Sequence, residues 1–61
     1  MTKMVRVENA DTSNNPIVVQ VWERRDTGPD EMVTEQFLYN PCDMTQGITI
    51  HGQRYLVVKE V

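Results

Sequence analysis

The chain has 61 residues and a formal net charge of −3, so it forms at most one small domain, which we expect to span residues 1–61. Such a chain has little room for a core together with a substrate cavity of about 300 Å³ or more, and six basic residues against nine acidic ones disfavour nucleic-acid binding. No apolar stretch of about 18 residues is present to cross a membrane, while one cysteine and one histidine exclude an internal disulfide and argue against a structural zinc site.

Residues with a preference for β-strands dominate the composition. Val, Ile and Thr together number 18, whereas the strong helix formers Ala and Leu together number 3. The first predicted strand covers residues 3–8, in which Val5 and Val7 share one face. Residues 9–16 follow as a predicted loop, because their Asn, Asp and Ser side chains readily hydrogen-bond to nearby backbone.

The second predicted strand runs from residue 17 to residue 24 or 25 and is apolar on both faces. Its faces carry Ile17, Val19 and Val21 on one side and Val18, Gln20, Trp22 and Arg24 on the other. This pattern is typical of a central strand, or of a strand whose outer face meets a partner.

A turn is predicted at residues 26–30, where Gly28 tolerates a positive φ and Pro29 fixes its own. The third predicted strand follows at residues 31–40 and forms a hairpin with the second. Glu35 interrupts one of its apolar sides, which indicates a bulge or a strand that extends beyond the core.

The last third of the sequence predicts a second hairpin. Pro41 breaks the pattern, and a short strand at residues 47–51 is separated by a tight turn from a final strand at residues 54–61. The expected fold is therefore all-β, with about five antiparallel strands in a small sandwich or half-open barrel. It consists of a lone N-terminal strand and two hairpins.

The residues capable of catalysis are few and lie apart in the sequence. His51 falls in a predicted turn, Ser13 in the polar loop, and Cys42 beside an acid, Asp43, rather than beside the cations that would activate a thiol. Turn and loop roles account for all three. We therefore expect no enzyme activity, no catalytic residues, no metal site and no cofactor.

Trp22 is the most informative single residue for function. If Ile17, Val19 and Val21 fill the core, Trp22 and Val18 point outward beside Arg24, and Trp and Arg are enriched among interface hot spots. Met4 lies on the polar side of its predicted strand, so it is a further apolar candidate for contact with a partner. The predicted partner-binding residues are Trp22, Val18, Arg24 and Met4.

An open sheet of five strands has two edges, and unpaired edges are templates for further strand pairing. Because a core this small leaves the lone chain only marginally stable, we expect a homo-oligomer or a multi-copy assembly. Short apolar strands with few charges at the edges suit β-strand addition between subunits.

Three segments carry a resemblance to a known group of proteins. They are residues 4–9 (MVRVEN), 18–23 (VVQVWE) and 54–60 (RYLVVKE). In these segments and in the spacing between them, the chain resembles small proteins encoded among the structural genes of tailed bacteriophages. The resemblance implies a virion component, present in many copies on larger proteins, and brings no catalytic residues with it.

The function predicted from these observations is that of a non-enzymatic bacteriophage structural protein, a capsid-decorating or head–tail accessory component that binds capsid or tail proteins. Its expected location is the virion, after synthesis in the host cytoplasm, with no nucleic acid and no membrane among its partners. The alternative is a phage-encoded inhibitor of a host or defence enzyme. One contiguous face formed by five acids would favour the inhibitor. Those acids are Glu23, Asp26, Asp30, Glu31 and Glu35.

Overall fold

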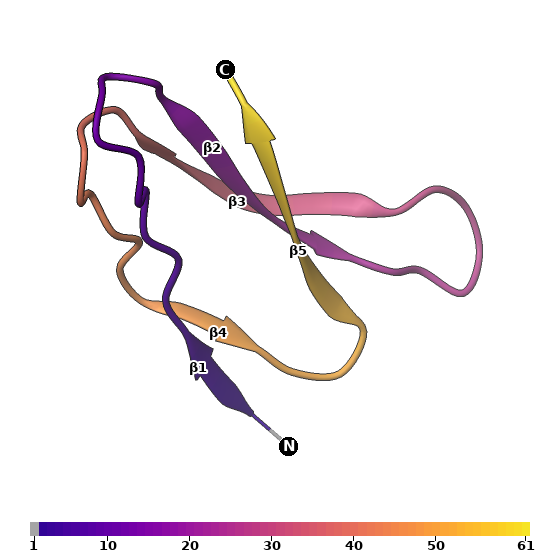
Figure 1. Ribbon diagram of the computed structural model, residues 1–61. Coiled ribbons are helices and arrows are strands. Elements are labelled where there is room, and N and C mark those ends of the chain that lie inside the picture. The colour runs from indigo at the N-terminus through magenta and orange to yellow at the C-terminus, as the bar shows by residue number, and fades with distance from the viewer. Residues whose placement is uncertain (1) are drawn as a thin grey trace.

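The computed structural model describes residues 2–61 and contains five strands and no helix in that range (Figure 1). All strand pairs are antiparallel, and they form two separate sheets rather than a closed barrel. The predicted all-β fold with five strands is confirmed. The strands are β1 (Lys3–Val5), β2 (Ile17–Glu23), β3 (Glu31–Leu38), β4 (Ile48–Ile50) and β5 (Arg54–Glu60).

The larger sheet has the order β3-β2-β5, so β2 is the central strand, as its two apolar faces indicated. The predicted hairpin of β2 and β3 is present. Strand β5 pairs with β2 in an unbroken register from Ile17 opposite Glu60 to Glu23 opposite Arg54. The β2–β3 register shifts between Val21 and Trp22, which places a bulge in β3 near residues 32–34. Residues 31–35 are all exposed, so β3 also extends beyond the core.

The second predicted hairpin is wrong. Strand β4 pairs with β1 and not with β5, so the N-terminal strand is not alone (Figure 1). The β1–β4 ladder continues past the strands, because the Thr45 N–H donates to the Val7 carbonyl at 2.9 Å and the Val7 N–H donates to Thr45 Oγ1 at 3.0 Å. The turn at residues 51–53 therefore carries the chain from one sheet to the other.

The core lies between the two sheets and explains this pairing. Val19 and Val21 of β2 and Leu38 of β3 pack with Ile48 of β4, and all four side chains are buried. Because Ile48 must reach the core beneath β2, β4 lies over one face of the larger sheet instead of beside β5. Partly buried side chains complete the cluster: Val5, Val7, Ile17 and Leu56.

A buried asparagine joins the polar loop to both layers. The Asn9 side chain is 3% exposed, and its Nδ2 donates to the carbonyls of Asn15 at 3.0 Å and Leu38 at 3.3 Å. Its backbone N–H donates to the Asp43 carbonyl, and its own carbonyl accepts from the Cys42 N–H, both at 2.8 Å. The loop after β1 is thereby fixed to the end of β3 and to the segment before β4.

The molecule is flat and elongated, with principal dimensions of 41 × 23 × 12 Å. Its radius of gyration of 12.6 Å exceeds the roughly 10–11 Å expected of a compact chain of this length. The distal end of the β2–β3 hairpin causes the difference, because it extends beyond the rest of the molecule (Figure 1). Every residue from 24 to 35 is exposed. The small core thus lies toward the other end of these strands.

Candidate protein-interaction surface

The face of the larger sheet that is turned away from the core forms the candidate site, and we call it the outer face. In an antiparallel pair, residues directly opposite each other share a face, so the register assigns its members. The outer face comprises Val18, Gln20 and Trp22 of β2, Met32, Glu35 and Phe37 of β3, and Tyr55, Val57 and Lys59 of β5. None of them belongs to the core cluster.

Trp22 lies on this face, half-buried between Met32 and Tyr55 in the register. Its Nε1 donates to Gln20 Oε1 at 2.9 Å, and Gln20 Nε2 in turn donates to Glu35 Oε2 at 3.3 Å. The indole N–H is therefore satisfied within the sheet, and the ring is held in place by its own strand. A partner would meet a ring whose position is already fixed, which lowers the entropic cost of binding.

An aromatic pair extends the outer face beyond β3. The rings of Phe37 and Tyr39 stack with their centroids 5.8 Å apart and an interplanar angle of 12°. Phe37 is 42% exposed and Tyr39 is 57% exposed, so the two rings stabilise each other but remain open to solvent. Exposed aromatic groups of this kind are enriched at protein interfaces.

Tyr55 and Arg24 form the other end of the outer face. The Arg24 guanidinium carbon lies 5.9 Å from the centroid of the Tyr55 ring, which is within cation–π range. The Tyr55 hydroxyl donates a hydrogen bond to Asp30 Oδ2 in the hairpin loop. That hydrogen bond is the main cause of a raised pKa of Tyr55, with desolvation and the Asp30 charge adding to it and Arg24 opposing it.

The structure brings together three of the four predicted partner-binding residues. Trp22 and Val18 share the outer face, and Arg24 adjoins it, whereas Met4 lies on β1 in the other sheet. Val18 does face outward, but it is only 7% exposed between Phe37 and Lys59, so it offers little contact area of its own.

Sequence reasoning did not select Phe37, Tyr39, Met32 or Tyr55. The alternation of the third strand did place Phe37 and Tyr39 on one side, and this was the available signal. The register with β2 decides whether these two rings face the core or the outside of the sheet. The residue pattern alone does not fix that register.

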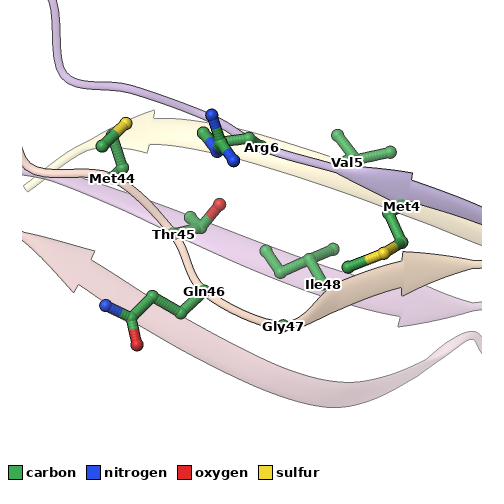
Figure 2. Close-up of a pocket in the computed structure, with 8 residues that line it drawn as sticks. All are labelled: Met4, Val5, Arg6, Met44, Thr45, Gln46, Gly47 and Ile48. Carbon is green, nitrogen blue, oxygen red and sulfur yellow. The ribbon is translucent and has the colours of Figure 1, made fainter.

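Met4 instead lines a groove of about 670 Å³ along the β1–β4 sheet (Figure 2). Figure 2 shows Met4 and Met44 near its two ends, with Arg6 between them. Met4 is 80% exposed. The lining side chains include no carboxylate, imidazole or thiol. They are Met4, Val5, Arg6, Met44, Thr45, Gln46, Gly47 and Ile48.

The residues considered for catalysis occupy three loops. His51 is exposed in the turn before β5, and Cys42 is exposed with a positive φ of 69°. The Ser13 hydroxyl bonds to Asp11 and Asn15, while the Asp43 carboxylate accepts from the Asn40 N–H. Within residues 2–61, no group of three or more His, Cys, Asp and Glu side chains is placed to hold a metal ion.

The five acids of the alternative hypothesis do not form one face. Glu23 and Glu31 lie opposite each other on the core side of the sheet, where Arg54 and Arg25 pair with them. Glu35 lies on the outer face and accepts from Gln20. The contiguous acidic surface that would favour an inhibitor is therefore not formed by these residues.

Comparison with known proteins found no family model that matches the chain. It found no matching curated protein and no matching solved structure. Among residues 2–61 there is no helix of the length and apolarity needed to cross a membrane. The functional argument for this chain therefore rests on its own surfaces.

Proposed function

We propose that this chain is a non-enzymatic bacteriophage structural protein that binds capsid or tail proteins through its outer face. In this role it decorates the capsid or serves as an accessory component at the head–tail junction. The resemblance of residues 4–9, 18–23 and 54–60 to small phage structural-region proteins supports the phage origin. The site of action is then the virion.

The observation that carries the proposal is the uncovered outer face. The only other sheet, β1–β4, packs on the opposite side of the larger sheet, so within residues 2–61 no layer covers Trp22, Phe37 and Tyr39. Exposed apolar surface rimmed by polar side chains is characteristic of binding surfaces. Here Glu35 and Lys59 lie on the two edge strands, and Gln20 lies at the centre of the face, where Trp22 and Glu35 satisfy its side chain.

Charge pairing favours a protein partner over a nucleic acid. Two of the six basic residues, Arg25 and Arg54, are already paired with Glu31 and Glu23. A third, Arg24, lies over the Tyr55 ring. The positive charge left for phosphate contacts is small, whereas fixed aromatic rings suit a protein surface.

Purified phage particles test this proposal directly. Mass spectrometry of the virions should detect the chain, and particles that lack it would contradict the proposal. A Phe37→Ala variant should be lost from particles, because truncation of an anchor that the partner covers costs about 2 kcal/mol or more in association. Met44→Ala is the matched control, since Met44 is similarly exposed but lies on the other sheet. If M44A is lost and F37A is retained, the groove and not the outer face is the site.

A further inference from the structure

The two edges of the larger sheet differ in how far they are protected. Strand β3 has an irregular register near Trp22, and the Gln36 side chain near its end exchanges two hydrogen bonds with the backbone of Gln46. Strand β5 has seven consecutive pairs with β2 and, among residues 2–61, no strand on its other side. Irregular and covered edges resist further pairing, so β5 is the edge open to another strand.

The backbone of β5 shows which groups face this open edge. The Val61 N–H donates to the Pro16 carbonyl, and the Gln53 carbonyl accepts from the Arg24 N–H, so residues 53 and 61 direct their backbone groups toward β2. Backbone direction alternates along a strand, so Leu56, Val58 and Glu60 direct theirs outward. Within residues 2–61, no hydrogen bond outside the strand ladders engages these three outward N–H groups.

We propose that β5 pairs antiparallel with β5 of a second copy of this chain, around a twofold axis at Val57. In this register Leu56 lies opposite Val58 of the second copy, and Arg54 lies opposite Glu60. The outward residues then form the hydrogen-bonded pairs of the new ladder, and Val57 meets its own copy in the non-hydrogen-bonded pair at the axis.

Side-chain charge selects this register among those that the backbone allows. Arg54 and Glu60 meet with opposite charges, and the twofold axis makes this contact twice. The Arg54 guanidinium has five N–H donors, so it can also keep its 3.3 Å ion pair with Glu23. If one β5 strand slides by two residues along the other, the charged pair is lost. In one direction apolar Val58 lies opposite Arg54, and in the other direction apolar Leu56 lies opposite Glu60. A shift of one residue exchanges the two faces of the sheet.

The pairing also accounts for an exposed apolar residue on the core side of the sheet. Val58 lies opposite buried Val19 in the β2–β5 register, yet it is 52% exposed. Leu56 of the second copy would lie directly beside it and cover it. Opposite residues share a face, so the dimer places both outer faces on the same side of one six-stranded sheet.

The solution mass of the isolated full chain tests the proposal. Sedimentation should show a concentration-dependent shift from the 7.1 kDa chain mass to twice that value. Amide hydrogen exchange should report the register, because the N–H groups of Leu56, Val58 and Glu60 gain protection at high concentration. The N–H groups of Tyr55, Val57 and Lys59 are protected by β2 at every concentration. A single-chain mass at millimolar concentration would overturn the proposal.

Two variants identify the edge. Val58→Pro removes an outward N–H and leaves the β2–β5 ladder intact, so it should abolish the dimer. Glu60→Lys places like charges opposite each other twice, and it should raise the dimer dissociation constant on the order of tenfold. Glu8→Lys is the control, because it makes the same charge change on a segment that pairs with Met44. A dimer that E60K and E8K weaken equally would contradict pairing through β5.

This test requires no phage component. Absence of the chain from virions leaves the dimer prediction unaffected, and a monomeric chain leaves binding through Phe37 unaffected. The two proposals therefore fail separately.

Discussion

Asn9 shows how one buried polar side chain determines the course of a loop. Its amide donates to two carbonyls and its carbonyl oxygen accepts from the Asp11 N–H at 3.1 Å, so each polar atom of the side chain is used. The sequence placed Asn9 in a loop of exposed turn residues, because a local pattern does not show that Leu38 and Asp43 will reach it. Burial that depends on distant segments was a part of the fold that sequence reasoning missed.

Asn9→Ala should lower the free energy of unfolding by about 2–3 kcal/mol, since it leaves buried carbonyls without donors. Asn9→Asp should be at least as damaging, because a carboxylate accepts but does not donate. Urea denaturation measures both effects. Asn14→Ala, at an exposed position of the same loop, should change stability by less than about 0.5 kcal/mol. An equal loss in N14A would contradict the role assigned to Asn9.

We expect Trp22 to contribute to partner binding more than to the core, because it lies on the outer face. Trp22→Ala should weaken association with a partner on the outer face by about 2 kcal/mol or more, while the isolated chain still folds. The comparison is Val19→Ala, which truncates a fully buried core side chain and should lower the free energy of unfolding. Urea melts of both variants, with a binding titration of W22A, separate the effects. If W22A lowers the free energy of unfolding by about 3–5 kcal/mol, Trp22 belongs to the core instead.

At the scale of elements, the sequence predicted all five strands and the β2–β3 hairpin but not the partner of β4. Alternation and turn residues are local, and they located each strand to within about three residues. The pairing of β4 with β1 depends on Ile48 reaching the core beneath β2, which is a property of the packed molecule. A three-residue strand has too little pattern of its own to specify a neighbour.

The hydrogen bond between Tyr55 and Asp30 fixes the hairpin loop to β5, and its effect should depend on pH. The folded chain raises the pKa of Tyr55 above its usual value, so the stabilisation is complete below about pH 10 and is lost as the pH rises through the folded pKa. Phenolate absorbance in a Tyr39→Phe background isolates this titration, because the chain has two tyrosines. Asp30→Asn should shift the Tyr55 titration to lower pH. An unchanged titration curve in D30N would contradict the assigned cause.

At the scale of the whole molecule, composition predicted the central physical fact, that the interior is small. Four buried side chains and four partly buried ones form the core cluster, and the second sheet covers only one face of the larger sheet. The elongated shape was not predictable from composition, since it arises from the exposed hairpin between residues 24 and 35. Surfaces of this extent relative to the core favour a protein that acts through contacts.

The register that joins Ile17 to Glu60 has a kinetic consequence. Among residues 2–61 the β2–β3 hairpin is the one local ladder. The β2–β5 ladder closes at Glu23 and Arg54, 31 positions apart, and the β1–β4 ladder at Val5 and Ile48, 43 positions apart. Loop-closure entropy must be overcome before those distant contacts form, so the hairpin should form within microseconds and the complete fold within milliseconds to seconds. During that interval the edges of the hairpin are unpaired, and the chain is then most exposed to aggregation.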